Sequence, residues 1–221
     1  MVYDRRIDDD TLTFEASGAL KHAALVMRDR ETDSWWSIME AKAIAGDREG
    51  KPLRELPVSV KTTWGEWRKR HPGSRVLSVN GTTHLGQNVY QEYLETDQTY
   101  PSSGPEDDRL PPKTAIFAFR RDGEPTAVPH DRIEGAVVLR VGTTGDAPLV
   151  LLYREAGAPL LESTRAYRLP AALAESDDPD GLARRIEGEI AKGTPGVERI
   201  AGFDTFWYTW AAQNPETRII P

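Results

Sequence analysis

The chain has 221 residues, enough to bury a sizeable core in one domain or in two small fused ones. Hydrophobic residues make up 38% and charged residues 29%, which is typical of a folded chain rather than a disordered one. The net charge of −7 repels phosphate backbones and anionic lipid, so we expect neither nucleic acid nor a membrane among the partners. There is no cysteine, which excludes disulfides, thiolate nucleophiles and cysteine-ligated metals.

The N-terminus is charged from Asp4 onward and lacks the apolar stretch of a signal peptide. No segment offers the roughly 20 apolar residues that a membrane-spanning helix requires. We therefore expect a cytoplasmic protein if Met1 is the native start. An extracytoplasmic location stays open if the chain is a truncated piece.

The first third of the chain alternates in the manner of β-strands. Residues 2–7 and 11–16 flank an acidic run, Asp8 to Asp10, that predicts a hairpin turn, and residues 24–27 predict a third strand. Thr63 and Glu66 form the pattern of a capping box at the start of a helix. Pro72 ends that helix, and residues 75–79 predict a strand.

The second half begins after a segment rich in Gly, Pro, Ser and Asp, residues 81–112, which we interpret as a long loop or linker. Strands are expected at 113–121, 124–128, 135–141 and 147–154. Asp122-Gly123 predicts a hairpin, and Gly142 to Gly145 a turn. A helix is expected from Pro179 to about Gly193, because Leu182, Ile186 and Ile190 recur at helical spacing.

A shift of 143 positions aligns residues 64–77 with residues 207–220, and four pairs are identical: Trp64/Trp207, Trp67/Trp210, Pro72/Pro215 and Arg75/Arg218. A weaker match aligns residues 43–56 with 189–200. Two tryptophans three residues apart share one helix face. That spacing favours a structural anchor buried in the core of each copy over an aromatic platform for a flat ligand.

The repeat predicts a β-rich α+β fold of two related antiparallel β units, each closed by a short Trp-bearing helix. Residues 1–80 would form the first unit, 81–112 the linker and 113–221 the second unit. We expect these parts to make one compact domain.

Several short motifs occur together in this chain: Thr13-Phe14 through Ser17-Gly18; Val26 to Arg30 with Thr32 and Ser34; Trp36-Ser37; Ala43 to Gly46 with Gly50 and Leu53; Thr63 to Trp67 with His71-Pro72; Arg109 to Lys113; and Phe206-Trp207 to Pro215-Glu216-Thr217. In this combination the chain resembles the domain-of-unknown-function family numbered 3179, a group of uncharacterised bacterial and archaeal proteins.

The resemblance implies a Cys-Pro-x-Cys element before the first strand and an upstream segment of the first repeat, and neither is in this sequence. Ile38 stands where the family carries Gln, Ala41 and Ala118 where it carries Gly, and Val128 where it carries Tyr. We interpret the chain as a degenerate member that keeps the fold and has lost redox or metal chemistry.

The remaining residues offer little catalytic chemistry. His22, His71, His84 and His130 are dispersed without metal-ligand spacing, and no serine lies in a Gly-x-Ser-x-Gly elbow. The acidic clusters do not fit a calcium loop, and solvated turns explain them. We therefore expect no cofactor and no metal.

Charged side chains beside a tryptophan pair form the best candidate site. An arginine there would hold an anionic group while the indoles supply a wall, and the alternative is a charged turn with Trp36 in the core. His84 in the long loop is the most exposed imidazole candidate. The candidate ligand-binding residues are Arg28, Asp29, Arg30, Ser34, Trp35, Trp36 and His84.

The sequence favours a non-catalytic ligand-binding or interaction protein whose partner is an unknown small molecule or protein, with a homo-oligomer as a further option. The alternative is a hydrolase or redox-type enzyme with a site near residues 28–37 and the 80–112 loop. A third option is a passive member that needs a partner chain to complete its fold.

Overall fold

The structure is a computed structural model. It describes residues 1–78, 90–101, 104, 106–133, 135–140, 149–155, 157–174 and 178–220. For residues 136–140 and 179–180 only the backbone is described. His84 and the predicted turn at 142–145 lie outside these residues. The described chain is β-rich with few helices, and its strands form three four-stranded sheets and one hairpin. The expected β-rich α+β class is confirmed. Among the described residues no helix is both long and apolar enough to cross a bilayer.

The N-terminal sheet is an antiparallel meander in the order β3-β4-β5-β6, formed by β3 (Phe14–Lys21), β4 (Ala24–Asp29), β5 (Trp35–Ser37) and β6 (Lys42–Ala45). The strand expected at 24–27 is thus confirmed. The acidic turn at Asp8 joins β1 (Arg6–Ile7) and β2 (Asp10–Thr11), as predicted. The strand expected over 2–7 is wrong for most of its length, because Tyr3 forms only an isolated bridge with Glu55.

The middle sheet has the order β13-β7-β8-β14, and the C-terminal sheet has the order β12-β11-β10-β9. The Asp122-Gly123 hairpin is confirmed, since both residues have positive φ (51° and 88°) and connect two paired strands. The strands are β7 (Ala115–Arg121), β8 (Glu124–Pro129), β9 (Gly135–Arg140), β10 (Leu149–Arg154), β11 (Thr164–Leu169), β12 (Glu198–Ile200), β13 (Gly202–Phe206) and β14 (Arg218–Ile219).

The described helices are short except for one. The expected long helix is confirmed as α3: Asp178 caps it by accepting from the Gly181 backbone N–H at 2.9 Å, and Gly193 ends it with φ 72°. Two single turns of 3₁₀ helix, His130–Arg132 and Ala171–Leu173, follow β8 and β11. The α-helices are α1 (Trp64–Arg70), α2 (Gln91–Glu95), α3 (Pro179–Lys192) and α4 (Trp207–Ala211).

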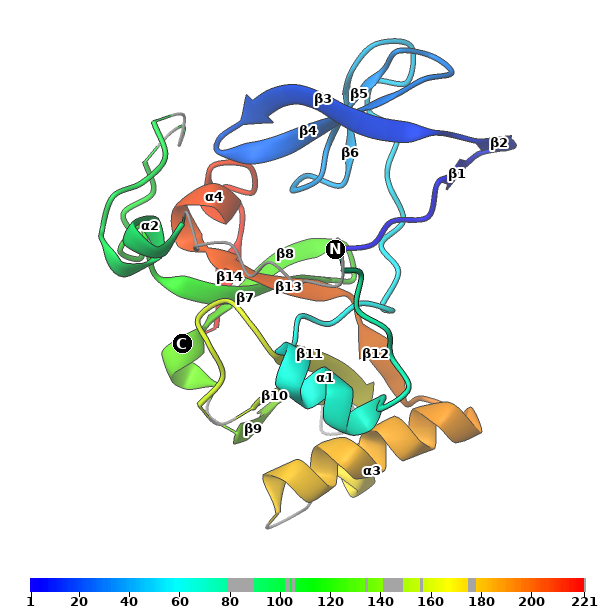
Figure 1. Cartoon of the computed structure of the whole chain (residues 1–221), viewed down its shortest axis with the longest axis vertical. Coiled ribbons are helices and arrows are strands. Elements are labelled where there is room, and N and C mark those ends of the chain that lie inside the picture. The colour runs from blue at the N-terminus through cyan, green and yellow to red at the C-terminus, as the bar shows by residue number, and fades with distance from the viewer. Residues whose placement is uncertain are drawn as a thin grey trace.

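Successive side chains of the central strands point to opposite faces of the sheet, and this alternation explains how the sheets stack. Phe117 and Phe119 of β7 point toward Leu152 of β10, whereas Ile116 and Ala118 point to the opposite face and contact α4. On the far side of the C-terminal sheet, its apolar side chains pack against α3. The layers are therefore N-terminal sheet, α4, middle sheet, C-terminal sheet and α3 (Figure 1).

The two copies of the tryptophan motif lie in different environments. Trp207 and Trp210 on α4 are completely buried between the N-terminal and middle sheets, where they contact Met39. On α1, by contrast, Trp64 is 47% exposed and Trp67 39% exposed, and no residue of the helix is buried. The expectation of a buried anchor in each copy is thus right for α4 and wrong for α1. The strand expected at 75–79 is also wrong for its described part, because residues 75–78 form no strand.

The local structure of the two motifs is nevertheless the same. Trp67 Nε1 donates to Ser74 Oγ at 2.8 Å, and at the equivalent positions Trp210 Nε1 donates to Thr217 Oγ1 at 2.8 Å. In each copy the hydroxyl residue also donates its backbone N–H to the carbonyl three residues earlier, at 3.0 Å.

These matching hydrogen bonds support the duplication, which stays a prediction. The weaker upstream match is wrong as a structural equivalence, since it aligns residues of strand β6 with residues of helix α3.

Candidate functional site

Three residues of the sequence-predicted site form a buried turn between β4 and β5. Asp29, Ser34 and Trp36 are all fully buried. The Asp29 carboxylate accepts from Trp36 Nε1 at 2.8 Å and from the Thr32 backbone N–H at 2.6 Å. Burial alone would raise the pKa of Asp29, but these hydrogen bonds bring it below its ordinary value. Because their polar atoms are already paired, these residues hold the turn together.

The other described members of that site lie on the outer face of the same sheet. Arg28 and Trp35 are opposite one another in the β4–β5 register, and Arg28 Nη2 contacts Glu15 Oε1 at 2.7 Å. Glu15 also pairs with Arg30, at 2.7 Å. The six described residues are therefore split between two faces of the sheet, and none of them lines the pockets described below. Trp36 lies in the core, as the alternative of a charged turn expects.

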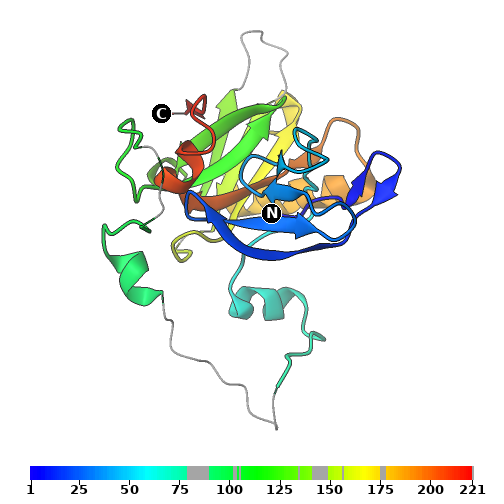
Figure 2. The same ribbon diagram turned by 90° about the horizontal axis from the view of Figure 1, so that it is seen from above.

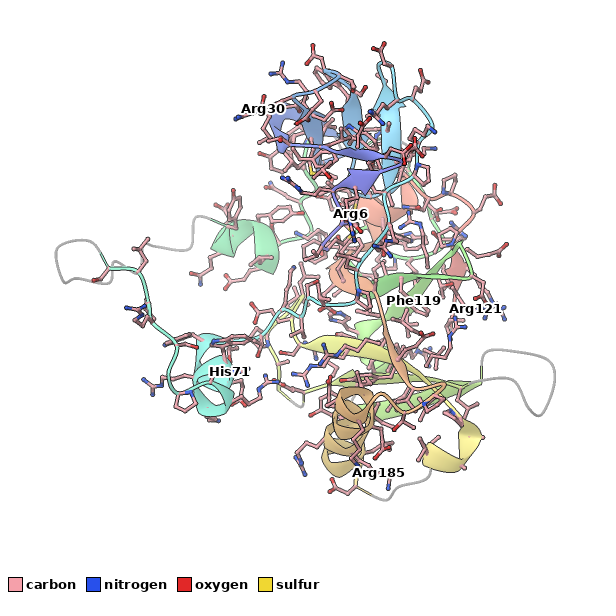
Figure 3. The ribbon with its side chains drawn as sticks, turned by 90° about the vertical axis from the view of Figure 1, so that its right-hand side faces the viewer. Arg6, Arg30, His71, Phe119, Arg121 and Arg185 are labelled. Atoms are coloured by element: carbon pink, nitrogen blue, oxygen red, sulfur yellow. The ribbon has the colours of Figure 1, made fainter. Side chains whose placement is uncertain are left out.

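A cleft lies beneath α1. It consists of a pocket of about 740 Å³ against β10, β11 and α3, and a second pocket of about 430 Å³ toward β12. The two share Arg70, Arg165 and Glu187 in their linings. Figure 1 shows α1 lying over β11 beside α3. In Figure 3, His71 after α1 and Arg185 of α3 lie at the end of the molecule that holds the C-terminal sheet, whereas Arg30 lies at the far end of the N-terminal sheet. The cleft is thus remote from the site expected from sequence.

The charged lining of the two pockets consists of four arginines and three glutamates: Arg70, Arg165, Arg184, Arg199, Glu66, Glu155 and Glu187. Arg165 from β11 and Arg70 from α1 both contact Glu155 Oε1, at 2.9 and 3.5 Å, so two positive charges share one carboxylate. Glu187 is bound by Arg199 and by the Tyr167 hydroxyl. Burial would raise its pKa, yet these contacts lower it, so the carboxylate stays ionised. The group around Glu155 is left with one net positive charge.

Two buried hydroxyl groups line the cleft without a partner. Ser163 is fully buried and Thr164 is 5% exposed, and neither side-chain oxygen forms a hydrogen bond in the described part of the structure. Ser163 lines the larger pocket and Thr164 the smaller one. Ser163 also adopts φ 67°, a left-handed conformation that costs a serine about 1 kcal/mol or more. A strained residue with an unpaired buried hydroxyl is typical of a functional position.

A buried imidazole–carboxylate pair lies directly behind these hydroxyls. His130 Nε2 contacts Asp204 Oδ1 at 2.7 Å, and Asp204 Oδ2 accepts from the Thr164 backbone N–H at 3.4 Å. His130 Nδ1 is buried and has no hydrogen-bond partner among the described residues. The Ser163 hydroxyl forms no hydrogen bond with this imidazole. The pair therefore positions Thr164 at the start of β11 but does not activate Ser163 in this conformation.

The described part of the 80–112 segment lines a separate pocket of about 440 Å³ together with Tyr208. Asp107 in its lining is held by Arg109, which also donates to the Thr217 carbonyl at 2.7 Å. Among the described residues of this lining, no buried side-chain nitrogen or oxygen lacks a hydrogen-bond partner, in contrast to the cleft under α1. The segment thus does not join residues 28–37 in one site, as far as the described residues show. Among those residues there is also no cluster of three potential metal ligands.

Sequence reasoning missed the cleft entirely. Arg70, Ser163, Thr164 and Arg165 come from two segments that no motif connects, and a positive φ at a serine leaves no mark on the sequence. Only the sheet pairing of β10 with β11 and the position of α1 bring these side chains together.

The protein is thus β-rich with few helices, and it has a cleft beneath α1 that is lined by charged and hydroxyl side chains. The chain belongs to the family described as "Protein of unknown function (DUF3179)", which matches residues 1–217, so the resemblance seen in the sequence is confirmed. No curated protein and no solved structure matches the chain significantly.

Proposed function

We propose that this protein binds a small anionic ligand, without catalysis, in the cleft beneath α1. The observation that carries the proposal is the unpaired hydroxyl of Ser163, a fully buried residue in the lining of the larger pocket. An unpaired buried polar group costs about 1–3 kcal/mol, and an acceptor atom on a ligand would remove that cost. Thr164 in the adjoining pocket offers a second such hydroxyl.

The charges of the lining indicate the ligand's chemistry. Arg70 and Arg165 share the Glu155 carboxylate, so N–H groups of these guanidiniums are left to bind a carboxylate or phosphate group on the ligand. In the lining of the smaller pocket, the rings of Trp67 and His71 pack against each other with centroids 4.1 Å apart and planes tilted by 32°, and they offer an aromatic surface. We therefore expect an anion that carries a planar or apolar part, of a size that fits about 740 Å³.

One observation favours an enzymatic function, although it lies at a different place from the enzyme site expected from the sequence. The buried His130–Asp204 pair has the form of a general base with its orienting carboxylate. A nucleophile would have to reach His130 Nδ1, and Ser163 does not do so here. A hydrolase would require Ser163 to move toward the imidazole on ligand binding. Hydrolysis of a bound ester by the native chain, and its loss in H130A, would support that alternative.

A thermal-shift screen followed by titration calorimetry tests the binding proposal. The panel contains inorganic phosphate, aromatic carboxylates and phosphorylated aromatic compounds, because any of these that binds the native state raises the melting temperature. In S163A the unpaired hydroxyl is gone, so we expect unchanged or higher stability of the free protein. We also expect affinity for the best anion to fall about tenfold, the effect of one lost hydrogen bond.

Ser37→Ala is the matched control. The Ser37 hydroxyl is also buried, but it donates to Gln213 Oε1 at 2.8 Å and lies far from the cleft lining. This variant should lose stability and keep its affinity, the reverse of S163A. A panel without any thermal shift, or equal affinity of S163A and the native chain, would contradict the proposal.

A further inference from the structure

The α1 segment, defined as residues 57–78, concentrates exposed apolar side chains. Of the thirteen large exposed hydrophobic side chains among the described residues, six belong to this segment, and Leu77 is 93% exposed. The six are Val58, Val60, Trp64, Trp67, Val76 and Leu77. Exposed apolar side chains gathered in one segment mark an interaction surface rather than the ordinary scatter of a protein surface.

The same segment carries a charge opposite to that of the rest of the chain. It holds five basic residues and one acidic residue, a net charge of +4, which leaves −11 for the remaining chain. The basic residues are Lys61, Arg68, Lys69, Arg70 and Arg75. An anionic surface therefore attracts this segment even though the whole protein is acidic, since screening confines such attractions to roughly 10 Å. The expectation of no membrane partner was drawn from the net charge of the whole chain, which differs in sign from the charge of this segment.

The comparison with α4 shows that α1 is not a core helix that has lost its cover. Where α4 has Ala211 and Ala212, α1 has Arg68 and Lys69. Two cationic side chains at these positions rule out burial between apolar sheets of the kind that encloses α4. Whatever covers α1 has to accept indole rings and cations together.

The shape of the segment suits a deformable surface. In Figure 2, α1 and its flanking chain extend away from the stacked sheets, and in Figure 3 the helix with His71 stands to one side of them. Trp64, Arg68 and Leu77 line neither part of the cleft. A projecting, mostly irregular segment suits a deformable partner better than the broad matched face of about 800 Å² that a stable protein interface needs. Its apolar side chains can enter a lipid headgroup layer separately.

From these observations we propose that the α1 segment docks on an anionic lipid surface, with Trp64 and Leu77 inserting and the basic side chains contacting headgroups. Indoles favour the boundary between headgroups and acyl chains, and lysine and arginine are drawn to anionic lipids. Trp64, Leu77, Arg68 and Arg75, on which the test below rests, line neither pocket of the cleft, so the proposal can fail or hold separately from ligand binding there.

Cosedimentation of the full chain with vesicles tests it. We compare phosphatidylcholine vesicles with vesicles that contain about 30% phosphatidylglycerol, at about 0.1 M salt where exposed charges are partly screened. Binding should be at least about tenfold stronger to the anionic vesicles. W64A/L77A and R68E/R75E should each reduce it about tenfold or more.

The control R5E/R132E makes the same charge change at exposed arginines outside the segment and should bind normally. Absence of binding to anionic vesicles, equal binding to both vesicle types, or equal loss in the control would overturn the proposal. Self-association that depends on Trp64, measured by light scattering without lipid, would overturn it in favour of a second copy of the chain.

Discussion

The two tryptophan motifs have the same hydrogen bonds and opposite environments. In both α1 and α4 the second indole donates to a hydroxyl seven residues later, and a proline turn separates the two. Yet Trp210 is fully buried and Trp67 is 39% exposed. The difference shows that this motif determines a local clamp, while burial depends on the residues around it and on the sheets that approach it.

Replacing one tryptophan in each copy by alanine should give the largest difference in the free energy of unfolding. Trp210→Ala removes a buried indole that contacts Phe203 and should lower the free energy of unfolding by about 3–5 kcal/mol. Trp64→Ala removes an exposed side chain and should change it by less than about 1 kcal/mol. Urea denaturation followed by circular dichroism measures both values. A loss of unfolding free energy in W64A comparable to that in W210A would mean that Trp64 is packed against the rest of the protein.

A third indole sharpens the comparison, because Trp36 is buried like Trp210 but donates to a charged acceptor. Asp29→Asn leaves one oxygen to accept the hydrogen bonds from Trp36 and Thr32, and we expect a loss of about 1–3 kcal/mol at pH 7. Trp67→Phe, which removes the exposed indole N–H bonded to Ser74, should cost much less.

The pH dependence of the stability of D29N shows in which pH range the Asp29 carboxylate stabilises the fold. The pKa of Asp29 is lowered in the folded state, so its carboxylate stabilises the fold above its ordinary pKa of about 4. That stabilisation is lost as the pH falls through the folded-state pKa. The difference in unfolding free energy between the native chain and D29N should therefore shrink below about pH 4. A difference that stays constant down to pH 2 would be inconsistent with a lowered pKa.

The smallest effect concerns how each helix begins. The Thr63 hydroxyl accepts from the Glu66 backbone N–H at 3.3 Å, whereas α4 has no side-chain cap and is held by packing. Thr63→Ala should cost α1 about 1 kcal/mol locally and leave global unfolding almost unchanged. Hydrogen exchange of the α1 amides, compared with those of α3 as an internal control, measures this. Slower or unchanged exchange at α1 would show that the cap does not limit its opening.

The sequence predicted those helices and turns that are determined by residues close together in the chain. The helix α3 could be predicted because Asp178, Pro179 and Gly193 mark its ends and its apolar residues recur at helical spacing. The β7–β8 hairpin followed from Asp122-Gly123, whose positive φ values suit a tight turn. Ala41 also has φ 55°, which gives a physical reason for the glycine that the family resemblance implies there.

The candidate site could not be predicted in the same way. The pattern at Arg28 to Trp36 combined charge with aromatic rings, but strand alternation sends Asp29 and Trp36 inward and Arg28 and Trp35 outward. Ser163 and Arg70 are almost a hundred residues apart and belong to no shared motif. Their meeting depends on long-range packing.

The sequence by itself thus determined the composition class, the family, the hairpins, the capped helices and the local tryptophan clamp. These features depend on interactions between residues close in the chain, or on residue types alone. Only the tertiary structure decided which tryptophan pair lies in the core and where a cleft with unpaired hydroxyls opens. Those outcomes depend on which sheet faces stack, and stacking is a property of surfaces assembled from distant segments.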